Sequence, residues 1–298
     1  MAADNSPIAP PRLFKYLPRS RVDVIENLRI RFTPLMATND IFEVRRTFKK
    51  LVGPKFDQLL SEQSADLDPE ATAIVELKKL GISDDQARVL AKETLIQKFG
   101  PDFKAILQKM VADVAKVVVP TLNRDDNIEQ VLMNVGGQLV GLSLSEDGHN
   151  SMMLAHYGEQ GRGFVLEFDT SDSFFSKSQI TGKTRRLQKV EYFDEPIEEL
   201  MDAPEKALIS KTTNWTFEKE WRLTLRADEA DIELPGSPDP IHLFNIPPSC
   251  ISKVLLGYNA DATFVAEMKA LTVATFQDLK IKKLVANRLA ATFSEVDV

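Results

Sequence analysis

The hydrophobic period of the chain changes near Gln138, and this change constrains the fold more than any other feature. Over residues 55–119, apolar residues recur at helical spacing, and one such stripe is formed by Ile106, Met110 and Val114. After Gln138, apolar and polar residues alternate in short segments, which is typical of strands with two different faces. The chain therefore carries both helix-forming and strand-forming parts.

Strand-type segments lie on both sides of the helical stretch. Before it, the sequence predicts two short strands, Leu13–Tyr16 and Ile30–Phe32. After it, the predicted strands are Leu139–Ser145, Gly163–Asp169, Val190–Phe193, Glu220–Arg226, Lys253–Gly257 and Ile281–Val285. A helix from Asn259 or Asp261 to about Leu279 precedes the last strand. We expect an α+β fold with a central mixed or antiparallel sheet.

Capping and stop residues divide the helical stretch into three or four helices. The signals are Asp68 with Pro69, Gly81, Ser83 and Gly100. A further helix is expected over Pro101–Val119. We interpret residues 55–135 as a packed helical insertion in a single domain of residues 13–290. Residues 1–12 are expected to form a flexible leader.

Composition narrows the classes of protein. Hydrophobic residues make up 43% and charged residues 27%, as in ordinary globular proteins. Cys250 is the single cysteine, which excludes an internal disulfide and a Cys₄ or Cys₂His₂ zinc site. The net charge of −7 argues against a protein that coats nucleic acid. Without a signal peptide or an apolar run of spanning length, we expect a cytoplasmic protein with no membrane contact.

The first candidate site is the segment Ser143–Tyr157. A strand ends in Ser143 and Ser145, and a polar turn and a short helix with His156 and Tyr157 follow. Loops at strand ends often present reactive groups from a rigid scaffold. Ser145 either caps the helix or meets a ligand. His156 is either functional or a core histidine that donates to a carbonyl, and Tyr157 is more often a packing residue.

The second candidate site is Lys211–Arg222. Glu218 and Glu220 are two residues apart at a strand start, so both carboxylates are expected on one face. Two close carboxylates suit acid–base chemistry or the stabilisation of a cation. The alternative is a surface salt-bridge ladder between Glu220 and Arg222. Trp215 and Trp221 either wall this site against water or act as core anchors.

Two weaker segments are Phe14–Tyr16 and Asn39–Glu43, and several common motifs are missing. The glycine-rich dinucleotide motif, the P-loop, the zincin helix and the serine-hydrolase elbow do not occur. The three histidines are widely spaced, and we predict no metal ligands.

Taken in order, these motifs resemble a mostly bacterial family of unassigned function, domain-of-unknown-function family 2971. The chain departs from the family at Ser143, where a cysteine is usual, and at Gly161, where a histidine is common. The matching residues are Phe14, Lys15, Tyr16, Asn39, Asp40, Phe42, Glu43, Ser143, Ser145, Glu146, Met153, His156, Tyr157, Gly163, Phe168, Asp169, Val190, Tyr192, Lys211, Trp215, Glu218, Glu220, Trp221 and Arg222.

The family layout is in turn similar to the ADP-ribosyltransferase plan, with NAD as the substrate that this implies. In such an enzyme a carboxylate stabilises the oxocarbenium ribose left by nicotinamide. The analogy implies that Glu220 is this carboxylate and that Glu218 orients the acceptor. It further implies that Tyr157 stacks on nicotinamide and that Lys15 or Tyr16 holds the adenosine ribose or the pyrophosphate.

Three functions remain open. The first is an ADP-ribosyltransferase-like toxin or phage-defence effector with an unknown macromolecular acceptor. It predicts that Glu218 and Glu220 meet Tyr157 and Lys15 in one cleft. The second is a non-catalytic nucleotide- or protein-binding module, with the same cleft but with the carboxylates paired to Arg222 or Lys211. The third is a metal-dependent nuclease or a glycosidase-type hydrolase; a nuclease site would use Asp169, Glu218 and Glu220. Further candidates for catalysis or for NAD contact are His156, Ser143, Ser145, Trp215 and Arg222.

Overall fold

The computed structural model of the chain falls into two compact units. The first comprises residues 1–46, 132–195 and 205–298, and the second comprises residues 47–131 and 196–204. The residues that the structure describes are 7–40, 42–43, 48–53, 56, 58, 68–177, 182–200, 204–276 and 278–298.

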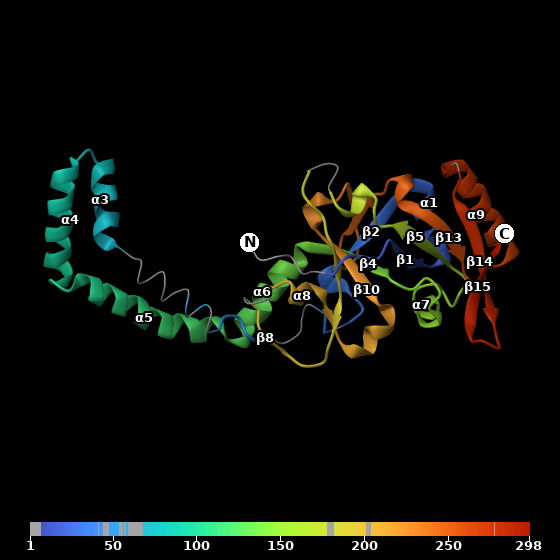
Figure 1. The fold of residues 1–298 in the computed structure, drawn as a ribbon, viewed down its shortest axis with the longest axis horizontal. Coiled ribbons are helices and arrows are strands. Elements are labelled where there is room, and N and C mark those ends of the chain that lie inside the picture. Colours follow the sequence, from blue (N-terminus) through green and yellow to red (C-terminus); the bar gives the residue numbers. More distant parts are fainter. Residues whose placement is uncertain are drawn as a thin grey trace. The chain divides into compact units, whose positions relative to one another are not determined.

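An 11-stranded sheet dominates the first unit (Figure 1). Its main order is β11-β12-β2-β4-β1-β5-β13-β14-β15, and β10 pairs with both β4 and β6. All of its pairs are antiparallel except β13–β14, so the predicted α+β fold with a mixed sheet is confirmed. Its strands are β1 Arg12–Leu17, β2 Arg29–Pro34, β4 Leu139–Ser145, β5 Phe164–Asp169, β6 Leu187–Lys189, β10 Glu220–Arg226, β11 Ile232–Leu234, β12 Ile241–Asn245, β13 Ile251–Leu256, β14 Lys280–Asn287 and β15 Thr292–Asp297.

The remaining elements of the first unit are short helices and one small sheet. The strands β7 Glu191–Tyr192 and β9 Ser210–Lys211 form a parallel pair. The predicted helix after Asp261 is present but ends at Thr275, before the expected Leu279. The α-helices that lie wholly in this unit are α1 Asp23–Asn27, α7 Ser151–His156, α8 Lys206–Ile209 and α9 Ala262–Thr275.

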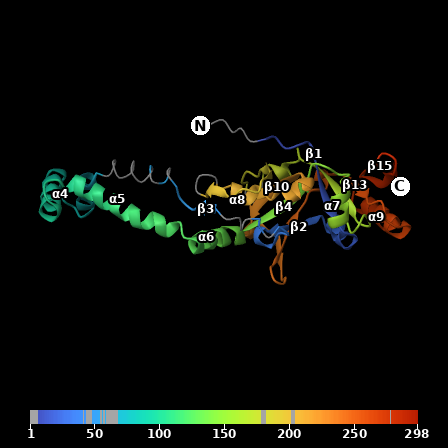
Figure 2. The same ribbon diagram turned by 90° about the horizontal axis from the view of Figure 1, so that it is seen from below.

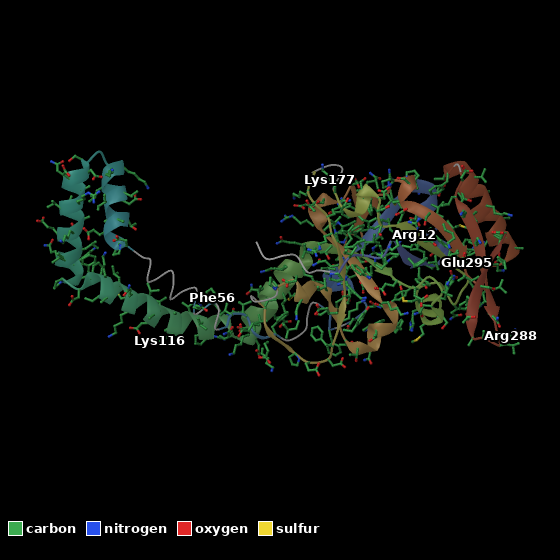
Figure 3. The ribbon with its side chains drawn as sticks, viewed as in Figure 1. Arg12, Phe56, Lys116, Lys177, Arg288 and Glu295 are labelled. Atoms are coloured by element: carbon green, nitrogen blue, oxygen red, sulfur yellow. The ribbon has the colours of Figure 1, made fainter. Side chains whose placement is uncertain are left out.

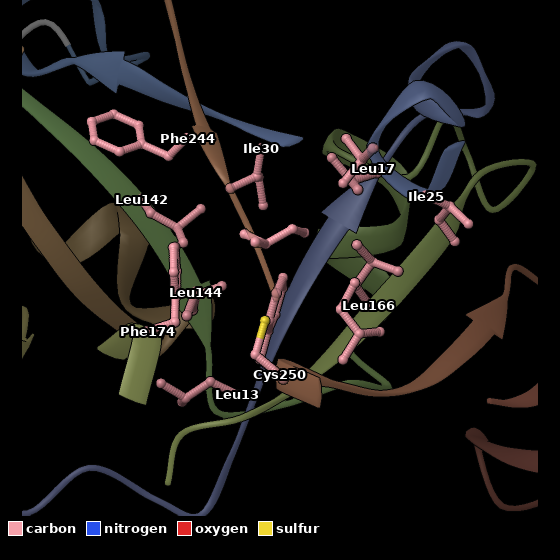
Figure 4. Close-up of a cluster of buried hydrophobic side chains, with 14 of the residues drawn as sticks. Leu13, Leu17, Ile25, Ile30, Leu142, Leu144, Leu166, Phe174, Phe244 and Cys250 are labelled. Carbon is pink, nitrogen blue, oxygen red and sulfur yellow. The ribbon is translucent and has the colours of Figure 1, made fainter. Parts of the chain in front are cut away.

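The large hydrophobic core lies on one face of the sheet, beneath α1 and α9. Alternation along β10 places Trp221, Leu223 and Leu225 in this core. Figure 4 shows side chains from several strands and from α1 converging here, with the thiol of Cys250 among them. A smaller cluster on the opposite face joins Val165 of β5 to Met153 and Leu154 of α7. This second face carries the site described below.

The second unit is mainly helical (Figures 1 and 2). Asp68 caps its first described helix by accepting from the backbone N–H groups of Glu70 and Ala71. Gly81 and Gly100 follow helix ends with left-handed φ angles of 87° and 86°, which glycine adopts without strain. Its described elements are β3 Phe48–Lys50, α3 Pro69–Lys79, α4 Asp84–Phe99, α5 Phe103–Leu122, α6 Asp125–Gly137, which continues into the first unit, and β8 Ile197–Glu199.

The apolar stripe of α5 is not packed as its spacing led us to expect. Ile106, Met110 and Val114 are 39%, 51% and 59% exposed. Helical periodicity identified the helix correctly but not what covers it. No helix among the described residues is long and apolar enough to cross a membrane.

Candidate functional site

A cavity of about 230 Å³ opens in the first unit where the sheet splits. Strand β4 pairs with β10 along its whole length. On its other edge it pairs with β2 only at Val140 and Gly141, and with β1 only at Ser145. Between these contacts β1 and β2 diverge, and residues from both strands line the cavity with Ser143 and Leu144 of β4. The split therefore creates the space without breaking the β4–β10 ladder.

Glu218 and Glu220 meet in this cavity, but not by the strand alternation we predicted. Glu218 ends a 3₁₀ turn, Thr213–Glu218, and Glu220 is the first residue of β10. Lys219 between them adopts a left-handed conformation, with φ of 45°, and redirects the chain. Both carboxylates then reach Lys211 of β9, whose Nζ lies 2.6 Å from Oε2 of each.

A buried ion cluster forms behind the cavity wall. Arg222 donates to Oε1 of Glu220 from Nε at 2.9 Å and from Nη2 at 2.8 Å. Nη1 of Arg222 also pairs with Glu43, and Lys211 Nζ lies 3.6 Å from the other Glu43 oxygen. All five residues of the cluster, Glu43, Lys211, Glu218, Glu220 and Arg222, are at most 4% exposed. Buried charges persist only when they are paired in this way.

Glu43 was absent from our candidate sites, and Lys211 was considered only as a possible partner of the two carboxylates. Both residues belong to the motifs that carried the family resemblance. Their contact with each other could not be predicted, because a pairing between residues 168 positions apart depends on the tertiary fold. Gly141 contributes to the fit, since a Cβ there would lie 2.8 Å from the side chain of Leu35 and 3.3 Å from Cδ of Arg222.

The cluster sets the protonation of its members. Burial alone would raise the pKa of Glu220, but Arg222 and Lys211 hold that pKa well below its usual range. For Glu43 burial prevails and raises the pKa. The pKa values of Lys211 and Arg222 lie above their usual ranges, because the carboxylates outweigh the effect of burial. Glu220 is therefore an anion whose charge is already offset by two cations.

Tyr157 joins the cluster from α7. Its hydroxyl donates to Oε1 of Glu218 and accepts from Nδ2 of Asn39. Burial and the neighbouring Glu218 raise the pKa of Tyr157, so the phenol stays protonated at neutral pH. Asn150 fixes this helix: its Oδ1 caps the first turn, and its Nδ2 donates to the carbonyl of Phe217 at 2.8 Å. Ser145 does not cap the helix; its hydroxyl accepts from the N–H of Asp147.

Lys15 and Tyr16 both line the cavity but differ in their bonding. Nζ of Lys15 donates to the carbonyl of Ser143 at 3.0 Å. Burial lowers the pKa of Lys15 to about 8, although Glu220 and Glu218 act against this shift. The hydroxyl of Tyr16 instead donates to the Asp147 carbonyl at 2.5 Å and accepts from the N–H of Asn150 at 3.0 Å.

The structure separates the remaining candidates from the cavity. His156 is exposed and stacks on Phe217, with ring centroids 5.7 Å apart. Trp215 is half-buried, and its ring centroid lies 5.6 Å from Nζ of Lys211. Trp221 is a core anchor on the opposite face of β10 and donates to Glu146 at 2.7 Å. Of the predicted residues, Lys15, Tyr16, Ser143, Tyr157, Glu218 and Glu220 line the cavity.

The ligands considered for a nuclease metal are not brought together. Asp169 pairs with Arg12, whose Nη1 lies 2.5 Å from Oδ2, and it also accepts from Ser171 (Figure 3 labels Arg12). Within the described ranges, no group of three or more His, Cys, Asp or Glu side chains is arranged to hold a metal ion.

Comparison with known proteins bears on the family but not on the activity. The model of the family described as "Protein of unknown function (DUF2971)" matches residues 153–223. This match confirms the family resemblance inferred from the motifs, and it covers Tyr157, Lys211, Glu218, Glu220 and Arg222. No curated protein and no solved structure matches the chain. The function must therefore be argued from the site.

Proposed function

We propose that the chain is a ligand-binding protein whose cavity takes a small molecule of the nucleoside class. The observation that carries this proposal is the composition of the cavity wall. Phe14 and Tyr157 supply aromatic surface, and Glu218 supplies a fixed acceptor next to polar side chains such as Asn39. Ligand sites typically combine apolar and aromatic surface with a few placed polar groups.

The size of the cavity supports a ligand of this class. Its volume, about 230 Å³, is below the usual range for drug-sized ligands, so it fits a nucleoside portion rather than a whole dinucleotide. Tyr157 and Lys211 hold the Glu218 carboxylate from two sides, so it is preorganised to accept from a ribose hydroxyl. A fixed acceptor loses little conformational entropy when the ligand binds.

The ion pairs favour binding over turnover. An enzyme that stabilises an oxocarbenium ribose needs a carboxylate whose attraction to the ribose strengthens in the transition state. Lys211 and Arg222 already offset the charge of Glu220, and Lys211 also pairs with Glu218. This is the pairing that the binding-module hypothesis predicted.

ADP-ribosyl transfer from NAD is the second candidate. It is favoured by one specific observation: Lys15, Tyr157, Glu218 and Glu220 all line the same cavity, as that hypothesis required. In this case the nicotinamide riboside end of NAD would occupy the cavity, and the rest of the dinucleotide would extend from it. The acceptor, protein or nucleic acid, is not specified by the cavity.

A thermal-shift series tests the proposal. The probes are adenosine, nicotinamide riboside, their 5′-monophosphates and NAD, measured with wild type, Glu218→Gln and Glu267→Gln. Glu267 is a matched control because it lies on α9 and pairs with Arg19 on the surface. A probe at ~100 times its dissociation constant stabilises the fold by about 2.7 kcal/mol, which is a rise of roughly 4 °C at an unfolding entropy of about 2.1 cal/mol/K per residue.

We expect at least one probe to raise the midpoint in wild type and Glu267→Gln, and to lose most of the effect in Glu218→Gln. No shift with any probe at millimolar concentration would contradict the proposal. Chromatographic assay of nicotinamide after incubation with NAD separates the two candidates, since only transfer or hydrolysis releases it. Release that Glu218→Gln or Glu220→Gln abolishes would favour the enzyme.

A further inference from the structure

We propose that the natural ligand carries an anionic group, a phosphate or a carboxylate, and that this group binds Nζ of Lys15. This inference rests on the proposed ligand binding in the cavity and specifies the chemistry of that ligand. It distinguishes Lys15 from Tyr16, which the sequence analysis gave as alternative contacts for the same part of the ligand.

Of the described cations beside the cavity, Lys211 and Arg222 are already engaged by protein carboxylates. Lys211 lies within 4 Å of Glu43, Glu218 and Glu220. Arg222 pairs with Glu43 and Glu220, and its Nη1 also donates to the carbonyl of Leu208 at 2.7 Å. The charge of both cations is therefore already compensated within the protein.

Lys15 is differently placed. Its bond to the Ser143 carbonyl uses one of the three N–H donors of the ammonium. Among the described residues, no carboxylate lies within the 4 Å of an ion pair with its Nζ. A partly buried cation without a counter-ion is unfavourable, and a ligand anion in the cavity would compensate it.

The other cavity groups do not compete for the anion. The hydroxyl of Tyr16 is occupied by Asp147 and Asn150, so it cannot reorient towards a ligand without losing both bonds. Tyr157 presents its hydroxyl to Glu218 and Asn39. Lys15 is thus the charged anchor left for an anion, with polar side chains beside it for the rest of the ligand.

The charges facing Lys15 from other elements are compatible with this assignment. The groups that act on its titration are Glu218 and Glu220, which favour the ammonium, and Lys211 and Arg21, which oppose it. Lys211 and Arg222 neutralise much of the negative charge of the two glutamates. An arriving phosphate is therefore repelled less than the number of carboxylates suggests.

Matched ligand pairs test the inference by calorimetric titration. Each pair differs by one anionic group: nicotinamide riboside and its 5′-monophosphate, adenosine and AMP, and nicotinamide riboside and nicotinic acid riboside. The first two pairs report a phosphate and the third a carboxylate. The proteins are wild type, Lys15→Gln, Lys15→Arg and the exposed-lysine control Lys206→Gln. Variants are first checked for a cooperative unfolding transition.

At pH 7 we expect the anionic member of at least one pair to bind wild type and Lys206→Gln about tenfold tighter or more. Lys15→Gln should lose this preference and keep its affinity for the member that lacks the anionic group, and Lys15→Arg should retain part of the preference. In wild type the phosphate preference should fall between pH 7 and pH 9.5, because the phosphate is already mostly dianionic at pH 7 while Lys15 loses its proton over this range. This pH arm does not depend on any variant.

Equal binding of both members of every pair to wild type, or a preference unchanged in Lys15→Gln, would overturn the inference and leave the proposed ligand binding standing. Failure of every probe to bind would contradict the proposed function itself, and the inference would fall with it. The two failures are therefore distinguishable.

Discussion

The ammonium of Lys211 lies 2.6 Å from Oε2 of Glu220, and neither residue is more than 3% exposed. An ion pair so far removed from water holds both side chains in a fixed geometry. If the two charges separated, each would remain buried without a partner, which is strongly unfavourable. The same ammonium reaches Glu218 and Glu43. Lys211 is therefore the residue that holds the cavity wall together.

Replacing Lys211 by methionine should destabilise the fold strongly. The substitution keeps most of the length of the side chain but removes the ammonium. Glu43 and Glu220 then depend on Arg222, and Glu218 loses its ammonium partner, so we expect a loss of about 3–5 kcal/mol in the free energy of unfolding. Urea titration measures this. Lys206→Met is the control, since its pair with Glu191 is 3.8 Å long and 43% exposed on the lysine side, and should cost below ~1 kcal/mol. Equal effects of both substitutions would contradict the role of Lys211.

The β10 face opposite the cavity should behave as ordinary core. Leu223 is completely buried, so Leu223→Ala should cost about 2–5 kcal/mol through lost transfer energy and the void it leaves. Leu289, in the turn after β14, is fully exposed, and Leu289→Ala should change the free energy of unfolding by less than about 0.5 kcal/mol. If the two substitutions had similar effects, the assignment of the core face of β10 would be wrong.

Lys15 should make the stability depend on pH in the alkaline range. Its pKa of about 8 in the folded state is below the usual 10.5, so between these values the unfolded chain binds more protons. The free energy of unfolding should therefore rise with pH across this window, relative to Lys15→Met, which lacks the group. Urea titrations of both proteins at pH 7.5 and 9.5 measure the difference. A wild type that loses stability relative to Lys15→Met on going to pH 9.5 would contradict the shift.

His156 should be dispensable for ligand binding. Its ring is exposed, stacks on Phe217 and does not line the cavity. We expect His156→Ala to keep the ligand-induced thermal shift of wild type, whereas Tyr157→Phe should reduce it by releasing Glu218 from one of its two partners. Loss of the shift in His156→Ala alone would place the ligand on the outer face of α7.

Local patterns predicted the strands well but not the way they assemble. The alternation in Leu139–Ser145 and Glu220–Arg226 gave both strands with the bounds that the structure has. The short strand β6 and the polar strand β15 were missed, because segments so short or so polar carry little periodic signal. The expected packing of the apolar stripe of α5 was also wrong, because helical periodicity identifies the apolar face of a helix but not the element that covers it.

The site was predicted in part for the same physical reason. Glu218, Glu220 and Tyr157 were found because unusual residue types lay close together in the sequence. Glu43 was not assigned to the site, since its contact with Arg222 spans most of the chain. An ion pair between residues so far apart leaves no local pattern. The pairing of Glu220 with Lys211 or Arg222, in contrast, lies within one segment and was among the alternatives that the sequence left open.

The location of bound ligand is the most direct test of the account. Met153 lines the cavity, whereas Met268 of α9 is buried in the large hydrophobic core. With ¹³C-methyl-labelled methionine and Met153→Leu for assignment, a nuclear magnetic resonance titration with nicotinamide mononucleotide or AMP should shift the Met153 signal and leave Met268 in place. Saturating binding that leaves Met153 unchanged while other methionines shift would show that the ligand site lies elsewhere.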